Sequence, residues 1–527
     1  MTTVLTASRG QKRLMLLWLL ILNGLFLIPA LALPGPIPWL SVEALALWAL
    51  ACLRPHAGNR LTVVLAFTYS TIALLALADA LVRQSLGRGL NLYLEAGLVN
   101  AGWNLLNTNL GATVAVLALA LVLGLLGGIG WLFGLSLERL RHHSPTHLGK
   151  PLLLVTGLAV AGTVTPLIGT PALALVAQQA SLITNTHQES EALAQRLEQQ
   201  PGPGNQRRSL PRLAGKDVVL GFLESYGIST LTDDRYRALI DQRLGAMADR
   251  LAAAGLTVAT GRLQSPIQGG QSWLGHLSVL SGHWVHNQLA YETLLSSGYP
   301  TLIDDFRQTG HRTLAVMPAI TQPWPEGRQL RYEQIYDHDD LDYQGPAFNW
   351  VTMPDQFTWQ WFQELRKRTT EPLFAELALI SSHAPWVPVL PVLKDWDTIG
   401  NGRVFERWRG TGEAPASLWR DPDRVRAHYS ESIAYALTVA GEFAARYVHA
   451  DTLMILLGDH QPAPLITGEN ASRDVIVHVI SGDPALIAPF LSGDLPGFQP
   501  GTRPDLRTPG APMDRFRPFL HRHFGSP

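Results

Sequence analysis

The sequence predicts two parts: an N-terminal α-helical transmembrane bundle of about five spans, then an α/β domain whose mainly parallel sheet is covered by helices on both faces. Hydrophobic residues make up 47% of the 527-residue chain and charged residues only 16%. The shortage of charge falls mostly in the first third, where long apolar stretches occur. Beyond it, short apolar runs alternate with helical patterns, which is typical of a parallel sheet with helical crossovers.

Five apolar stretches precede the first strand of the α/β part, and about 20 apolar residues suffice to cross the hydrocarbon core. They are residues 14–33, 39–53, 61–82, 112–135 and 152–177. A further run, 90–106, holds too many polar residues to span. We expect it to lie at the membrane interface, with Tyr93 and Trp103 at headgroup level. Glu43 and Asp79 fall inside spans, where pairing within the bundle or a place near an interface is favoured over a polar pathway.

Basic residues between these stretches predict how the chain crosses the membrane. They gather before the first stretch, after the second and after the fourth: Arg9, Lys12, Arg13, Arg54, Arg60, Arg139, Arg141 and Lys150. The loop after the first stretch has no Lys or Arg, and the loop after the third has only Arg83 and Arg88. This alternation predicts five spans with a cytoplasmic N-terminus. The first stretch lacks a convincing cleavage site, so we expect a multi-pass protein of the cell (inner) membrane with an extracytoplasmic, periplasmic α/β domain.

The expected division of the chain is a transmembrane domain at 1–178, a juxtamembrane helix and linker at 179–215, and the α/β domain at 216–527. Pro and Gly at 201–204 should end the juxtamembrane helix. A formal net charge of −1 gives no bulk attraction to nucleic acid, and we expect no such partner. The single cysteine, Cys52, excludes an internal disulfide and a cysteine metal cluster, and should be a small buried apolar side chain.

The α/β domain is expected to begin with a buried strand at 218–223. Further strands are predicted at 256–260, 313–317, 376–380, 453–457 and 475–480, and helices at 235–254, 273–280, 357–367 and 425–447. In such sheets, sites are built at the carboxyl ends of the strands.

Residues suited to bind a metal or to attack a substrate stand at these positions. Glu224 follows the strand at 218–223, His383 follows the strand at 376–380, and Asp459 with His460 follows the strand at 453–457. Ser272 opens a helix directly after the tight Gly269-Gly270-Gln271 turn. Carboxylates with an imidazole can bind a divalent metal, and a serine at the positive end of a helix is a candidate nucleophile once a metal lowers its pKa.

Each of these residues also has an ordinary structural explanation. Gly-Asp is common turn chemistry, which would account for Asp459. Ser272 could be a helix N-cap, Glu224 a solvated acid after a strand, and His383 a structural histidine.

The order of these motifs resembles the alkaline phosphatase/sulfatase superfamily. The motifs are a strand ending in Glu, a Gly-rich turn with a hydroxyl residue opening a helix, a strand followed by Ser-His-x-Pro, and a strand followed by Gly-Asp-His. Together with the spans, they resemble the membrane-anchored branch that contains lipoteichoic acid synthases, phosphoglycerol transferases and phosphoethanolamine transferases. Sulfatases themselves use a Cys/Ser-x-Pro-x-Arg motif, which this chain lacks.

The resemblance implies one bound divalent ion, manganese or zinc, held by Glu224, Ser272, Asp459 and His460. It implies that Ser272 is the nucleophile, although the family usually has Thr there. It further implies that His383 contacts the substrate phosphate, and that Trp324 and Arg328 contact the headgroup. A second substrate histidine of the synthases, expected after the central strand, is missing from the segment 316–319.

The function implied is transfer of a phospho-headgroup, phosphoglycerol or phosphoethanolamine, from a membrane phospholipid to a cell-envelope glycan or lipid through a covalent serine intermediate. A first alternative is a hydrolase, that is a phosphodiesterase or phosphatase using water at the same site. A second is a catalytically inactive membrane protein that binds lipid. The acceptor side has no recognisable motif, so the sequence leaves transfer and hydrolysis open.

Overall fold

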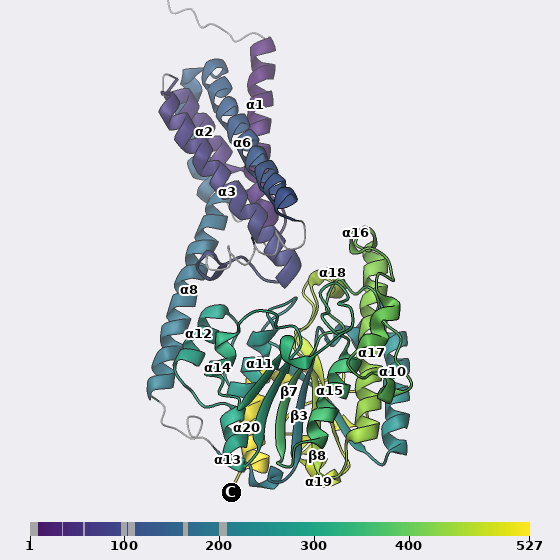
Figure 1. Ribbon diagram of the computed structural model, residues 1–527. Coiled ribbons are helices and arrows are strands. Elements are labelled where there is room, and N and C mark those ends of the chain that lie inside the picture. The colour runs from purple at the N-terminus through teal and green to yellow at the C-terminus, as the bar shows by residue number, and fades with distance from the viewer. Residues whose placement is uncertain are drawn as a thin grey trace, which may run out of the picture. The chain divides into compact units, whose positions relative to one another are not determined.

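The computed structural model describes residues 9–33, 35–55, 58–95, 103, 111–161, 167–199 and 208–526. It divides into two compact units, one comprising residues 1–84 and 88–189 and the other residues 85–87 and 190–527 (Figure 1). The boundary falls within helix α8 (Pro171–Gln199), which continues from the apolar region into the polar segment as expected. Residues 200–207 of the expected juxtamembrane helix and linker at 179–215, including the Pro and Gly residues at 201–204, lie outside the described residues.

The first unit is built from apolar helices. Three are long and apolar enough to cross a membrane, at Arg9–Ala32, Asn59–Leu86 and Ala112–His143. They correspond to α1 (Arg9–Leu27) with the turn that follows it, α3 (Asn59–Leu86) and α6 (Ala112–His143). Two apolar helices are shorter, at Val42–Leu53 (α2) and Thr146–Val160, the latter including most of α7 (Gly149–Ala161).

The apolar stretch 152–177, expected to span the membrane, is shared between two helices. Helix α7 ends at Ala161, and a short strand, β2 (Ile168–Gly169), pairs with β1 (Leu40–Ser41) before α8 begins at Pro171. The connecting residues 162–166 lie outside the described part, and so do residues 96–102 and 104–106 of the expected interface run 90–106. Residues 92–95 of that run form the short helix α4 (Leu92–Glu95).

Glu43 and Asp79, the two acids inside the expected spans, both have hydrogen-bonding partners in the first unit. Asp79 is fully buried, forms a 2.6 Å ion pair with Arg83 and accepts a hydrogen bond from the Leu90 amide. Glu43 accepts hydrogen bonds from the Ser41 hydroxyl and from the amides of Ala172 and Leu173 at the start of α8. Both acids therefore have the partners that carboxylates need in apolar surroundings. Cys52 is buried, as expected.

The second unit is organised around a nine-stranded sheet with the strand order β10-β4-β9-β8-β3-β7-β5-β6, and β11 beside β4. The strands are β3 (Asp217–Leu223), β4 (Thr257–Gln264), β5 (Arg312–Met317), β6 (Gln334–Asp337), β7 (Leu373–Leu379), β8 (Thr452–Gly458), β9 (Asp474–Ser481), β10 (Gln499–Pro500) and β11 (Ala511–Pro512). Strands β8, β3, β7, β5 and β6 are parallel, whereas β9 runs antiparallel to β8 and β4. The sheet is thus mixed but mostly parallel.

Helices cover both faces of this sheet (Figure 1). One face packs against α10 (Asp234–Ala253), α15 (Asp355–Lys367) and α17 (Pro422–Tyr447). The other packs against α11 (Ser272–Ser281), α12 (Gln288–Ser296), α13 (Leu302–Thr309) and α20 (Phe516–Phe524). Successive residues of β3 alternate between the two cores, with Val219 on the first face and Val218 and Leu220 on the second. This double covering explains why the central strands are almost continuously apolar.

Candidate metal centre and nucleophile

Strand register brings Glu224 and Asp459 side by side. Strands β3 and β8 are parallel neighbours, and Leu223 pairs with Gly458, so the next residue of each strand is a carboxylate. The Glu224 amide still donates to the Leu379 carbonyl of β7, which holds this residue at the edge of the sheet. The predicted convergence of the two acids therefore follows from the pairing of two buried strands.

Asp459 is positioned by backbone amides. Its Oδ1 accepts hydrogen bonds from the Ser225 amide at 2.8 Å and from the His460 amide at 2.7 Å. Its Oδ2 lies 3.5 Å from Nε2 of His460. Ser225 has a left-handed backbone with φ of 58°, and this conformation aims its amide at the carboxylate. One carboxylate oxygen is thus fixed by the chain, and the other faces the cluster.

His460 presents its Nε2 to the same cluster. Its Nδ1 lies 2.9 Å from the Gln461 carbonyl and donates to it, which leaves Nε2 as a lone-pair donor in the neutral imidazole. Nε2 lies 3.4 Å from Oε1 of Glu224. A backbone carbonyl that fixes the tautomer in this way is the usual outer partner of a metal-binding histidine.

Ser272 is the first residue of α11, and its hydroxyl does not cap the helix. The N-cap is Gln271, held in a left-handed conformation with φ of 66° after Gly269 and Gly270, which also have positive φ. The Ser272 hydroxyl lies 3.3 Å from Oε2 of Glu224 and 3.2 Å from Nε2 of His460. The explanation of Ser272 as an N-cap is therefore wrong.

The four side chains fit a divalent cation. Ligand atoms of Glu224, Asp459 and His460 lie within 4.8 Å of one another, and Ser272 adds a hydroxyl oxygen beside two of them. Carboxylate oxygen and imidazole nitrogen are ligands that zinc and other first-row divalent ions accept. Asp459 and His460 are buried to about 1% exposure, where two acids and an imidazole need a compensating charge.

Electrostatics within the cluster are those of closely packed opposite charges. Burial and the neighbouring Glu224 charge raise the pKa of Asp459. Burial tends to raise the pKa of Glu224 as well, but the charges of His460 and His383 and the Ser225 hydrogen bond outweigh it, and that pKa is lowered. Burial lowers and the two carboxylates raise the pKa of His460, and the carboxylates prevail. A bound cation would take over the role of the shared protons.

His383 borders this cluster. It follows β7 in a turn in which its Nδ1 donates to the Ala384 carbonyl at 2.6 Å, and its ring stacks on Trp350 with 6.1 Å between centroids. Its charge is close enough to lower the pKa of Glu224. Nε2 is therefore the nitrogen left to meet a ligand.

The two predicted headgroup residues are not part of the cluster. Trp324 immediately precedes helix α14 (Pro325–Gln329) and packs on the core beneath α12, while Arg328 is exposed on α14. Among the described residues, neither has a recorded contact with the Glu224–Asp459–His460 group. Their assignment to a headgroup stays a prediction.

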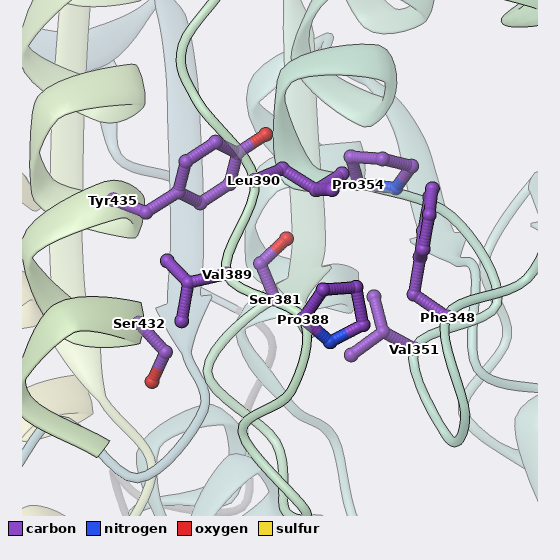
Figure 2. A pocket seen from close by; sticks show the side chains of 9 residues that line it. All are labelled: Phe348, Val351, Pro354, Ser381, Pro388, Val389, Leu390, Ser432 and Tyr435. Carbon is purple, nitrogen blue, oxygen red and sulfur yellow. The ribbon is translucent and has the colours of Figure 1, made fainter. Parts of the chain in front are cut away.

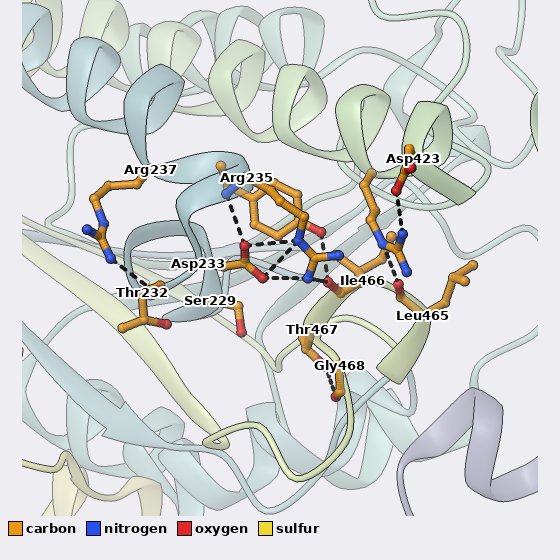
Figure 3. A network of polar contacts seen from close by, with 12 residues as sticks. Ser229, Thr232, Asp233, Arg235, Arg237, Asp423, Leu465, Ile466, Thr467 and Gly468 are labelled. Atoms are coloured by element: carbon orange, nitrogen blue, oxygen red, sulfur yellow. Dashed lines mark hydrogen bonds and ion pairs between the residues drawn. The ribbon is translucent and has the colours of Figure 1, made fainter. Parts of the chain in front are cut away.

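The loop after the Asp459-His460 pair is fastened to two helices (Figure 3). Arg235, which is paired with Asp233 at the start of α10, donates to the Ile466 carbonyl at 3.2 Å, and Tyr236 donates to the same carbonyl at 2.7 Å. From α17, Arg426 donates to the Leu465 carbonyl at 3.0 Å. These bonds to main-chain oxygens hold the loop that continues from the candidate ligands.

Figure 2 shows a pocket whose lining includes residues that precede and follow His383 in the chain. It is lined by Phe348, Val351, Pro354, Ser381, Pro388, Val389, Leu390, Ser432 and Tyr435. None of these lining side chains carries a charge at neutral pH, so the pocket offers no counter-ion for a phosphate. The pocket is distinct from the cluster of candidate ligands.

One network was not predicted from the sequence. The Glu376 carboxylate in the middle of β7 accepts hydrogen bonds from Nδ1 of His276, at 2.7 Å, and from the Tyr332 hydroxyl. An acid inside an otherwise apolar strand, and a histidine four residues after Ser272 on the same helix, were the available signals. The pairing itself depends on contacts between distant segments.

No family model matches the chain, and no curated protein matches it. Solved structures that resemble it include the lipoteichoic acid synthase LtaP from Listeria monocytogenes, 13% identical over 55% of this chain and 71% of that one, with a TM-score of 0.36. A protein in the alkaline phosphatase superfamily from Vibrio parahaemolyticus is 14% identical over 56% and 69%, with a TM-score of 0.35. The soluble domain of lipooligosaccharide phosphoethanolamine transferase A from Neisseria meningitidis is 13% identical over 50% and 76%, with a TM-score of 0.33. Sequence identities and TM-scores this low do not assign the chain to a family.

Proposed function

We propose that the chain is a membrane-bound, metal-dependent phosphotransferase of the alkaline phosphatase superfamily. It moves phosphoglycerol or phosphoethanolamine from a phospholipid to an extracytoplasmic glycan or lipid acceptor through a phosphoserine at Ser272. The observation that carries the proposal is the Ser272 hydroxyl, which lies 3.3 Å from Glu224 and 3.2 Å from His460 at the first turn of a helix. A hydroxyl between a candidate metal ligand set and a helix N-terminus is suited to attack an anionic phosphodiester.

Glu224, Ser272, Asp459 and His460 would hold one manganese or zinc ion. A cation there would lower the pKa of the Ser272 hydroxyl and neutralise charge on the phosphate oxygens. The hydroxyl oxygen of Ser272 forms a bond to phosphorus, and the bond from phosphorus to the lipid alcohol breaks. An acceptor hydroxyl then displaces Ser272. His383 stabilises the charge that develops on the phosphate, because its Nδ1 is occupied by a carbonyl and its Nε2 remains to donate.

The membrane part supplies proximity to the donor. We propose that residues 1–178 form a five-span anchor, that 179–215 connect it, and that 216–527 form the catalytic domain outside the cytoplasm. The three long apolar helices and the two shorter ones support an anchor of this kind. Lipid donors held in the same bilayer would be at high effective concentration for the catalytic domain. Trp324 and Arg328 are proposed to meet the headgroup.

The test is to incubate the full-length, detergent-solubilised chain with phosphatidylglycerol or phosphatidylethanolamine carrying a labelled headgroup. We expect released diacylglycerol and a labelled peptide that contains Ser272. Ser272→Ala should abolish both while leaving the melting temperature unchanged, and Ser278→Ala, further along α11, is the matched control. Label on Ser225, Ser278 or Ser281 instead would disprove the assignment of the nucleophile. Headgroup phosphate released into water without an added acceptor would identify a hydrolase.

A further inference from the structure

Outside the candidate metal cluster, Glu376 is a buried carboxylate in an otherwise apolar strand. It is 1% exposed and lies in the middle of β7, directly opposite Leu220 of β3 and Ala315 of β5. A buried carboxylate in such surroundings is tolerated only with hydrogen-bond partners. It has two: the Tyr332 hydroxyl donates to Oε2, and His276 donates to Oε1 from Nδ1 at 2.7 Å. The arrangement holds one histidine ring in one orientation.

Because Nδ1 of His276 points to Glu376, Nε2 is the nitrogen directed away from the buried acid. One face of the ring is covered by Phe222, with 3.7 Å between ring centroids and an interplanar angle of 12°. The His276 side chain nevertheless keeps 13% of its surface exposed, whereas Glu376 keeps only 2%. The ring is therefore partly exposed, and because Nδ1 donates to Glu376, Nε2 carries the lone pair of the neutral imidazole.

This ring belongs to the neighbourhood of Ser272. His276 follows Ser272 by four residues on α11, so the two share a helix face with about 5–6 Å between their Cβ atoms. Helical side chains lean toward the helix N-terminus, which brings the imidazole back over the turn that begins with Ser272. On β3, Phe222 under the ring and Glu224 beside the Ser272 hydroxyl are two residues apart and therefore share a face. Burial and Glu224 raise the pKa of Asp459, and a positive charge on His276 would counteract part of that rise, as expected for groups at close range.

We propose that His276 is the general base for Ser272, oriented by Glu376 and Tyr332, and that the proton passes directly or through one water. This inference rests on the proposed function. As the oxygen of Ser272 bonds to phosphorus, its proton moves to Nε2 of His276, which passes it to the oxygen of the departing lipid alcohol. In the second step Nε2 takes the proton of the acceptor hydroxyl as the acceptor oxygen bonds to phosphorus, and returns it to the Ser272 oxygen as the bond from phosphorus to serine breaks. A nucleophile, a base, and an acid that orients the base form the arrangement that activates serine on unrelated folds.

The alternative is that the three residues form only a structural network under α11, and the experiment separates the two. The probe is bis(p-nitrophenyl) phosphate with the full-length, metal-loaded chain, followed by rapid quenching and mass spectrometry of the Ser272 peptide. The departing p-nitrophenolate needs no proton, so any loss in adduct formation falls on the side of the nucleophile. We expect His276→Asn to slow adduct formation by ~10²–10⁴-fold, the usual contribution of a positioned base. Glu376→Gln should slow the same step less.

Controls distinguish chemistry from folding. His276→Asn should keep the melting temperature and bound metal of the unmodified chain, and millimolar imidazole should restore adduct formation to His276→Ala. The matched control is His338→Asn, since His338 also pairs with an acid, Asp339, but lies after β6. Adduct formation within twofold of the unmodified chain, loss of bound metal in His276→Asn, or failure of imidazole to rescue His276→Ala would each overturn the base assignment. If the unmodified chain forms no adduct on Ser272, the proposed function fails and this inference fails with it.

Discussion

The two carboxylate oxygens of Asp459 have different roles: Oδ1 accepts hydrogen bonds from backbone amides, and Oδ2 faces the candidate metal site. Two amides, of Ser225 and His460, hold Oδ1 and leave Oδ2 free of backbone bonds among the described residues. The Ser265 hydroxyl further donates to the Asp459 carbonyl at 2.7 Å. Because the side chain and the main chain are both held, Oδ2 is preorganised, and a cation would bind without first ordering this ligand.

The first prediction at this scale concerns Asp459→Asn. Replacing the carboxylate by an amide removes one negative charge and one anionic ligand, so bound metal should fall by more than the ~10–100-fold cost of losing an outer-shell partner. Metal content after purification, measured by mass spectrometry, checks this. Asp451→Asn at the opposite, exposed end of β8 is the matched control and should retain full metal. Equal metal content in the two variants would rule out Asp459 as a ligand.

A second prediction concerns Asp355, which is fully buried at the start of α15 and whose Oδ1 accepts from the Ser381 amide at 2.9 Å. Burial, assisted by the charge of Glu224, raises the pKa of Asp355 to about 6 from 3.8. The folded protein therefore favours the neutral acid. Its contribution to stability is complete below pH of about 4 and is lost as the pH rises through about 6, a change of ~3 kcal/mol for a shift of about two units.

Denaturation of the unmodified chain at several pH values between about 4 and 7 measures this effect, with Asp355→Asn as its own comparison. The variant cannot ionise, so its stability should lack the decline over that interval. A decline of the same size in Asp355→Asn would assign the effect to other groups.

The positions of the candidate ligands could be predicted because they depend on local pattern. Glu224, Asp459 and His383 each follow an apolar run long enough to be a strand, and parallel strands end at one edge. The Glu376–His276–Tyr332 network could not, because which side chains face each other across three segments is set by register and helix placement. Trp324 and Arg328 were selected from a loose resemblance rather than from spacing, and no contact among the described residues joins them to the cluster.

At the scale of whole elements, long apolar or strongly periodic segments were predicted well. All six expected strands of the second unit are present as β3, β4, β5, β7, β8 and β9, and the four expected helices as α10, α11, α15 and α17. The strands β6, β10 and β11 were not predicted, because two to four residues carry too little pattern to distinguish them from loops. Hydropathy alone did not predict that the stretch 152–177 is divided between two helices. Its Gly-Thr-Val-Thr-Pro segment contains residue types that favour an interruption.

Because α8 begins at Pro171, Glu43 can cap its first turn, and this role can be tested by substitution. Its Oε1 accepts from the amides of Ala172 at 3.0 Å and Leu173 at 3.2 Å, in the first turn of α8 where no helical carbonyl is available. Glu43→Leu would leave both amides without this partner, and loss of the part-buried Ala172 bond alone should cost ~1–3 kcal/mol. Glu43→Gln is the matched control, because its amide oxygen can still accept. Thermal denaturation in detergent should rank the leucine variant well below the glutamine variant, and equal melting temperatures would contradict the capping role.

At the scale of the whole molecule, the number of spans decides on which side of the membrane each loop lies. Three long helices alone, or five spans including the two shorter apolar helices, both put residues 208–526 opposite the N-terminus. The two arrangements differ at the loops between. The last turns of α6 carry Arg139 and Arg141, Lys150 follows at the start of α7, and five spans put this region in the cytoplasm, where basic residues concentrate. Three spans would put it outside.

Cysteine labelling separates these arrangements, because the chain has a single cysteine, Cys52, which is buried. On a Cys52→Ser background, His142→Cys would report the exposed last turn of α6, and Ser526→Cys the C-terminal region. With five spans, a membrane-impermeant maleimide added to intact cells with a permeable outer barrier should label Ser526→Cys and spare His142→Cys, which should react only after lysis. Labelling of both positions in intact cells would favour three spans, and labelling of neither would put the proposed catalytic domain in the cytoplasm, away from an extracytoplasmic acceptor.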